Sequence, residues 1–136
     1  MLFQRAEHGD LRILLVDDYP ETGVAFTALL SLLGHTCRSV MRGVAALEEA
    51  ERFAPDVVLC DLMLPDISGY DVGRELRARH GNKLYLVAIT GRNGPAHDRT
   101  RALAAGFDQH LLKPVSVDTL RTAITASQGA RISAQL

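Results

Sequence analysis

The feature that most constrains the fold is a fivefold alternation of short apolar runs with longer segments of helical spacing. The apolar runs have the length of strands, and the segments between them carry helix start and stop signals. This alternation predicts an α/β domain with a parallel sheet covered by helices on both faces, because right-handed crossovers return each helix to the sheet. The predicted strands are residues 11–16, 35–40, 56–60, 84–89 and 107–112.

Proline, serine and glycine residues mark the ends of the predicted helices. Pro20 suits a first helical turn because its missing N–H would have no partner there, and Gly34 suits a helix end. Ser68 with Asp71 resembles a capping box. The predicted helices are residues 20–34, 44–53, 68–81 and 95–106, and a fifth from about residue 116.

Four of the predicted strands end in side chains that can do chemistry. The acidic pair Asp17 and Asp18 follows the first strand, Asp61 the third, Thr90 the fourth and Lys113 the fifth. Ligands of parallel α/β sheets bind just outside the carboxyl ends of the strands, so we expect these side chains to share one pocket. A carboxylate directly after a buried strand, such as Asp61, is unusual without a partner.

Each of these residues alone also has a structural explanation. An acidic pair before a helix commonly caps that helix and favours its dipole. Thr90 alone is typical of a turn, and Lys113 alone of a solvated charge. Their joint occurrence, in order and at strand ends, favours a functional site.

Composition excludes several classes of protein. The 136 residues suit one domain, and 47% of them are hydrophobic, enough for a core. The net charge of -1 predicts neither nucleic-acid nor acidic-membrane binding. No stretch has membrane-spanning length or a signal-peptide core, so a cytoplasmic location is expected. Cys37 and Cys60 lack CxxC spacing and are expected to be buried free thiols.

The chain resembles the receiver domains of bacterial two-component response regulators, over about residues 11–127. The resemblance rests on the acidic pair, Thr90, Lys113-Pro114, and Asp61 followed by the run Leu64-Pro65-Asp66-Ile67-Ser68-Gly69. It implies a flavodoxin-like (βα)5 doubly wound fold with strand order 2-1-3-4-5. Residues 1–10 are then an N-terminal extension and residues 128–136 a C-terminal tail.

The resemblance also implies a role for each residue of the site. Asp61 is expected to be the phosphoacceptor, with Lys113 and the Thr90 hydroxyl each binding a phosphoryl oxygen. Clustered carboxylates repel one another, and a hard cation such as Mg²⁺ neutralises them. Asp18 and Asp61 are its expected direct ligands, with the Met63 carbonyl a third by resemblance and Asp17 acting partly through water.

The expected function is signalling, with no enzymatic activity beyond uptake and hydrolysis of the protein's own phosphoryl group. The expected phosphodonor is a histidine kinase or a histidine phosphotransfer protein. The expected output is a downstream protein that contacts the face of the fourth helix, fifth strand and fifth helix, and a homodimer is compatible with this. Only 22 residues follow Pro114, so we expect a stand-alone receiver or one cut from a hybrid kinase.

His110 is the main departure from the family pattern, which has Tyr or Phe as a switch at this place. Histidine here resembles the receivers of hybrid sensor kinases and phosphorelays. His110 is therefore expected to act with Thr90 as the switch. The alternative is a half-exposed strand histidine without a role.

Rival functions are distinguished by single residues. Haloacid-dehalogenase-like phosphatases need a second Asp two residues after the nucleophile, and Met63 stands there. A serine hydrolase would need a GxSxG elbow, which is missing from the sequence. A pseudo-receiver that binds partners without being phosphorylated remains the alternative.

Overall fold

A parallel sheet of five strands forms the centre of the protein. The computed structural model describes residues 10–91 and 98–135. The strands are β1 (Arg12–Val16), β2 (Thr36–Val40), β3 (Val57–Asp61), β4 (Tyr85–Thr90) and β5 (Gln109–Leu112). Their order is β2-β1-β3-β4-β5, and every neighbouring pair is parallel. The predicted fold class and strand order are therefore confirmed.

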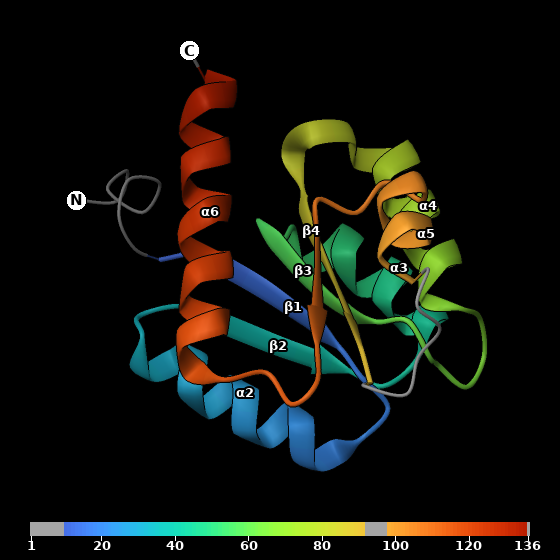
Figure 1. Cartoon of the computed structure of the whole chain (residues 1–136), viewed down its shortest axis with the longest axis horizontal. Helices are drawn as coiled ribbons and strands as arrows, with labels where there is room; N and C mark the ends of the chain where they lie inside the picture. The colour runs from blue at the N-terminus through green and yellow to red at the C-terminus, as the bar shows by residue number, and fades with distance from the viewer. Residues whose placement is uncertain (1–9, 92–97, 136) are drawn as a thin grey trace.

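Helices cover both faces of this sheet (Figure 1). One face carries α2 (Pro20–Leu32) and α6 (Val117–Gln135), and the other carries α3 (Gly43–Phe53), α4 (Gly69–His80) and α5 (Asp98–Ala104). A short 3-10 turn, η2 (Gly81–Lys83), links α4 to β4. Within the described residues, none of the helices combines the length and apolar character needed to cross a membrane.

Strand β1 is apolar after Arg12, and β3 is apolar up to Asp61, because both faces of these central strands are buried. In β1, Ile13 and Leu15 pack with Leu30 of α2 and Leu120 of α6, whereas Leu14 and Val16 belong to the core under α3, α4 and α5. Strand β3 is buried throughout. Two hydrophobic cores, one on each face, thus hold the strands in place, so that their carboxyl ends lie together at the same end of the sheet.

The loop after β3 is fastened to the helices on either side of it. Asp66 accepts hydrogen bonds from the backbone N–H groups of Gly43 (2.8 Å) and Val44 (2.9 Å), and so caps α3 from outside that helix. These bonds lower the pKa of Asp66 to about 2. Ser68 accepts from the Asp71 N–H at 3.2 Å, as the predicted cap requires. A methyl group on Gly69 would collide with the backbone carbonyl of Asp61, so α4 begins directly against the site.

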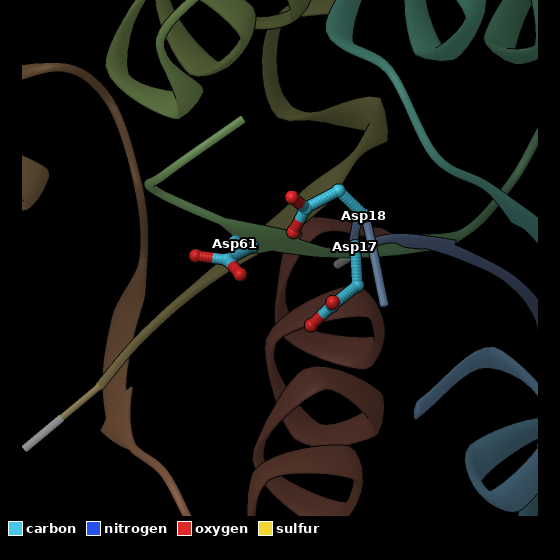
Figure 2. A group of neighbouring side chains, drawn as sticks. All are labelled: Asp17, Asp18 and Asp61. Carbon is cyan, nitrogen blue, oxygen red and sulfur yellow. The ribbon is translucent and has the colours of Figure 1, made fainter. Parts of the chain in front are cut away.

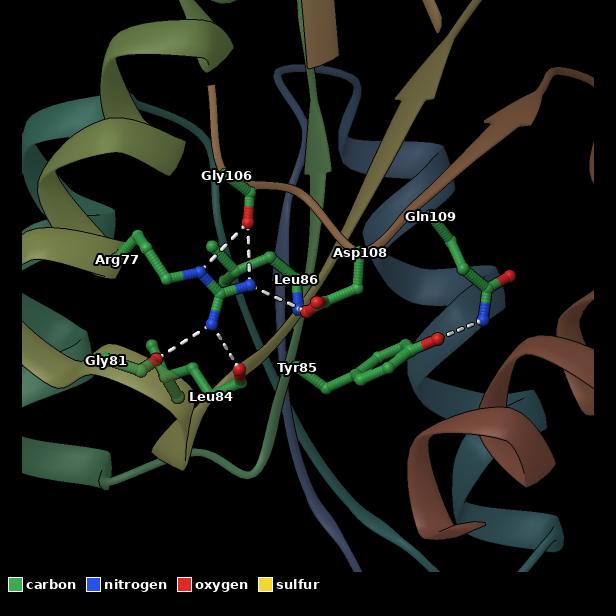
Figure 3. A network of polar contacts seen from close by, with 8 residues as sticks. All are labelled: Arg77, Gly81, Leu84, Tyr85, Leu86, Gly106, Asp108 and Gln109. Atoms are coloured by element: carbon green, nitrogen blue, oxygen red, sulfur yellow. Dashed lines mark hydrogen bonds and ion pairs between the residues drawn. The ribbon is translucent and has the colours of Figure 1, made fainter. Parts of the chain in front are cut away.

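At the amino-terminal end of strands β4 and β5, Arg77 of α4 holds several segments together (Figure 3). Its guanidinium donates to the Gly106 carbonyl (2.6 and 2.9 Å) and to the carbonyls of Gly81 (2.7 Å) and Leu84 (2.8 Å). It also pairs with Asp108 at 2.7 Å. One side chain thereby joins α4, the start of β4 and the segment before β5, far from the strand ends that carry the candidate site.

Several predicted boundaries are corrected by the structure. Strand β5 begins at Gln109 and not at Phe107, because Phe107 is buried against Gly73 in the core under α4. Strand β2 begins at Thr36 instead of residue 35, and α6 extends to Gln135, within the segment expected as a tail. The predicted helix start at Pro95 lies outside the described residues.

Candidate functional site

The acidic residues predicted to converge do so at the carboxyl edge of the sheet. Asp17 directly follows β1, and its N–H donates to the Val40 carbonyl at 3.1 Å. Asp61 ends β3, where it pairs in register with Ile89 of β4. Figure 2 shows Asp17, Asp18 and Asp61 grouped around this edge. Each contributes an oxygen to a set lying within 4.8 Å of one another, with Asp17 and Asp61 buried and Asp18 exposed.

Lys113 connects two of these carboxylates. Its ammonium donates to Asp17 Oδ2 at 2.6 Å and to Asp61 Oδ2 at 3.0 Å. The other oxygen of each carboxylate accepts from the backbone N–H two residues further on, that of Tyr19 or of Met63, at 2.9 Å in both cases. Both carboxylates are therefore held in fixed orientations by one shared ammonium and by their own loops.

Burial and charge act against each other on the ionisable groups of the site. Burial raises the pKa of Asp61, and the neighbouring Asp17 adds to this, while the Met63 N–H and Lys113 oppose it. Burial alone would lower the pKa of Lys113, but its hydrogen bonds to Asp17 and Asp61 outweigh burial and raise it. An excess of negative charge in a desolvated pocket is thus only partly balanced by one ammonium.

These residues fit a hard divalent cation. Three carboxylates with oxygens inside 4.8 Å supply the oxygen ligands that Mg²⁺ and Ca²⁺ use. The exposed Asp18 leaves one side of the cluster open to water, which suits an ion that retains water ligands. His and Cys side chains, which softer metals prefer, do not belong to this cluster.

Thr90 ends β4 beside the carboxylates, and it belongs to a second polar group that sequence reasoning missed. Its hydroxyl donates to Asp98 Oδ2 of α5 at 3.4 Å, and the other oxygen of Asp98 accepts from the Tyr70 hydroxyl of α4 at 2.9 Å. Asp98, which accepts both hydrogen bonds, is only 5% exposed, and the two donor residues are buried as well. A buried carboxylate eight residues after Thr90 has no local sequence signal, because the pairing depends on how α4 and α5 pack.

His110 lies half-buried on β5, next to Ala88 of β4 in register. Within the described part of the chain, its Nε2 is buried without a hydrogen-bond partner. Burial lowers the pKa of His110, with the Asp98 charge acting in the opposite direction. His110, the predicted switch residue, is thus close enough for the Asp98 charge to act on its pKa. No hydrogen bond joins His110 to Thr90 or Asp98 among the described residues.

Large apolar side chains surround the polar site. Tyr19 is 60% exposed, Met63 75% and Leu112 56%, and each stands within two residues of Asp17, Asp61 or Lys113. A groove of about 640 Å³ lies between α2 and the segment from Lys113 to Val115. Exposed apolar groups around a polar centre are typical of a surface that receives another protein.

Cys60, the residue before Asp61, is a fully buried free thiol. Burial, together with the charges of Asp61 and Asp17, raises its pKa far above the ordinary value. Cys37 is free and half-buried on β2. The expectation of free thiols is confirmed, and that of burial only for Cys60.

Comparison with known proteins gives a consistent result. The family described as response regulator receiver domain matches residues 13–125. The sensor histidine kinase RcsC of Salmonella typhimurium is 36% identical over 112 residues, which are 82% of this chain and 12% of RcsC. The aerobic respiration control sensor protein ArcB of Escherichia coli is 37% identical over 116 residues, 84% of this chain and 15% of ArcB. The chain therefore spans only a small part of these relatives.

Solved structures agree with this family match. The BeF3-activated N-terminal receiver domain of Klebsiella pneumoniae RstA has a TM-score of 0.79 and 27% identity, over 86% of this chain and 97% of that one. The chain is thus similar in sequence to part of a sensor histidine kinase and part of a sensor protein, and in fold to an N-terminal receiver domain.

Proposed function

The chain belongs to the response regulator receiver family, and on that premise we propose that it is a phosphoacceptor domain whose Asp61 takes a phosphoryl group from a phosphohistidine. The observation that carries this proposal is the setting of Asp61: a buried carboxylate at a strand end, bonded to Lys113 and beside two further carboxylates. The phosphodonor is a histidine kinase or a histidine phosphotransfer protein, because both present a phosphorylated imidazole.

The transfer requires little covalent chemistry from the protein. A carboxylate oxygen of Asp61 attacks phosphorus, the P–N bond breaks, and its electron pair returns to the donor imidazole. Negative charge spreads over three phosphoryl oxygens during this step, so positioning and positive charge carry the catalysis. Lys113, already 3.0 Å from Asp61, binds one of these oxygens, and the Thr90 hydroxyl binds another. Water later attacks the acyl phosphate, releasing inorganic phosphate and restoring Asp61.

A divalent cation, Mg²⁺ in our proposal, completes the site. When bound, it neutralises phosphoryl oxygen charge that the single ammonium of Lys113 cannot balance. Asp18 and Asp61 are the proposed direct ligands, with Asp17 acting through water. The Met63 backbone carbonyl is a proposed third ligand, since the N–H of the same residue donates to Asp61 and so places the Met63 backbone beside this carboxylate.

The proposed output is a change in the face formed by α5, β5 and α6. Phosphorylation offers the Thr90 hydroxyl a new acceptor and so biases an existing two-state equilibrium. We propose that His110 moves with Thr90, and that a downstream protein binds this face. A homodimer through the same face is compatible with the proposal, and a cytoplasmic location suits the proposed partners.

Selective labelling of Asp61 tests this function. Acetyl phosphate with Mg²⁺ should phosphorylate the wild type, and intact-mass spectrometry should detect one phosphoryl group. Asp61→Asn should remain unmodified, whereas Asp71→Asn, which alters an exposed carboxylate paired with Arg74, should be labelled like the wild type. An unlabelled wild type would favour the pseudo-receiver alternative, and equal labelling of Asp61→Asn would remove the assignment.

A further inference from the structure

Asp98 is a buried carboxylate that the phosphoryl-transfer chemistry does not use. It is 5% exposed, and its two oxygens accept from two neutral hydroxyls, those of Tyr70 (2.9 Å) and Thr90 (3.4 Å). A desolvated carboxylate is costly unless hydrogen bonds satisfy it. The hydrogen bonds from Tyr70 and from Thr90 therefore each help to stabilise the buried Asp98 carboxylate.

The contact with Thr90 has a consequence for the site. A threonine hydroxyl has a single proton to donate. In this structure that proton is directed to Asp98, so it is not available to an oxygen bound at Asp61. Thr90 can bind a phosphoryl oxygen only by giving up its hydrogen bond to Asp98.

We propose that Asp98 is a positioning residue that holds the Thr90 hydroxyl away from Asp61, and that Tyr70 sets how readily Asp98 releases it. This inference rests on the proposed function of Asp61. When Thr90 turns toward the phosphoryl group, Asp98 keeps the Tyr70 hydroxyl as the other of its two hydroxyl donors among the described residues. The Thr90–Asp98–Tyr70 contact thus fixes the resting population of the domain and the cost of its activation.

The hydroxyl and the ring of Tyr70 make different contacts, so the role of the hydroxyl can be tested separately. The guanidinium of Arg101 lies over that ring, 4.2 Å from its centroid, and Tyr70 as a residue is 7% exposed. Tyr70→Phe keeps the ring, its burial and the cation–π contact, and removes only the hydrogen bond to Asp98. This substitution therefore tests the hydroxyl alone.

The proposal predicts opposite effects for two conservative substitutions. Asp98→Asn keeps the shape of the side chain but removes its charge, which weakens the hold on Thr90 and favours activation. Tyr70→Phe leaves the carboxylate with Thr90 as its hydroxyl donor among the described residues, so activation would leave Asp98 without either hydroxyl, and activation becomes harder. General damage to the fold would shift both variants in the same direction.

Beryllofluoride with Mg²⁺ is the probe, because it occupies Asp61 as a phosphoryl analogue and its apparent affinity reports the population of the competent state. Affinities are measured by NMR titration of the backbone amide at position 90, with urea unfolding to verify that each variant is folded. Relative to the wild type, Asp98→Asn should bind at least threefold more tightly, and Tyr70→Phe at least threefold more weakly. In the double variant, the Tyr70→Phe effect should largely disappear, since both act through one contact.

Controls separate this proposal from that for Asp61. In a Thr90→Ala background, where the held hydroxyl is missing, Asp98→Asn should no longer change the affinity. Wild-type affinities in both single variants, or shifts in the same direction, would overturn the positioning role while leaving the phosphoacceptor in place. A wild type that binds beryllofluoride no better than Asp61→Asn would overturn both.

Discussion

Removal of the Lys113 ammonium should have opposite effects on protein stability and on cation binding. Lys113 is the shared partner of two carboxylates whose side chains are only 2% (Asp17) and 7% (Asp61) exposed, and its own side chain is 25% exposed. Lys113→Ala leaves both carboxylates facing each other in a desolvated pocket. Its effect therefore depends on what else can neutralise them.

Without divalent cations, we expect Lys113→Ala to lower the free energy of unfolding by about 3 kcal/mol, the low end of the range for breaking a buried ion pair. The low end applies because Lys113 is partly exposed and water can enter its place. Asp61 can also take up a proton, since burial already raises its pKa. A raised folded-state pKa contributes stability at low pH that is lost as pH rises through it. The deficit should therefore grow as pH rises through the raised pKa of Asp61.

Mg²⁺ should restore part of this stability. The ammonium occupies oxygens of Asp17 and Asp61 that a cation would share, and it repels that cation. Its removal should tighten Mg²⁺ binding by roughly tenfold, or about 1.4 kcal/mol. Ligand binding stabilises the folded state by RT ln(1 + L/Kd), with L the free ligand concentration, so the variant, with its lower Kd, gains more from Mg²⁺ than the wild type does.

Urea unfolding across a Mg²⁺ series measures both effects, with Asp18→Ala as the matched comparison. Asp18 is exposed, so its removal should change stability by less than about 0.5 kcal/mol and yet nearly abolish the response to Mg²⁺. The reasoning is refuted by a titration in which Lys113→Ala and Asp18→Ala lose Mg²⁺ affinity alike, or by a Lys113→Ala deficit that shrinks as pH rises.

Two further predictions concern the loop after β3 and the proposed switch. Asp66→Ala removes the external cap of α3 and should lower stability by about 1 kcal/mol at neutral pH in chemical unfolding. Because the pKa of Asp66 is lowered to about 2, this contribution is lost as pH falls from about 4 toward 2, and variant and wild type should then converge. Beryllofluoride should lower the pKa of His110 further in an NMR titration, since an inward imidazole is less well solvated in its charged form. Unchanged His110 titration alongside shifted Thr90 resonances would make His110 a bystander.

The fold and the acidic site could be predicted from the sequence because both depend on local patterns. Strand β3 is apolar at each position before Asp61. The strand ends carry carboxylate, hydroxyl and ammonium side chains, whose possible roles can be inferred from residue type. Phe107 misled the prediction of β5 because an apolar residue beside a strand is equally suited to the core, and here it packs on Gly73.

The Thr90–Asp98–Tyr70 contact could not be predicted in the same way. Tyr70 and Asp98 are 28 residues apart, and their meeting depends on the packing of α4 against α5. An acidic residue near a helix start is ordinarily a dipole partner facing solvent, so its type alone did not indicate burial. Long-range polar contacts of this kind become visible only once the helices are placed.

The buried thiol of Cys60 allows the opening of β3 to be measured by chemical labelling. Only the thiolate reacts with alkylating reagents, and Cys60 is fully buried with a raised pKa. Modification therefore has to wait for the strand to separate from the sheet, and its rate measures the free energy of that event. Cys37, half-buried on β2, reacts after a smaller fluctuation. The two natural cysteines thus allow thiol labelling to measure how strongly an occupant of Asp61 locks the strand that carries it.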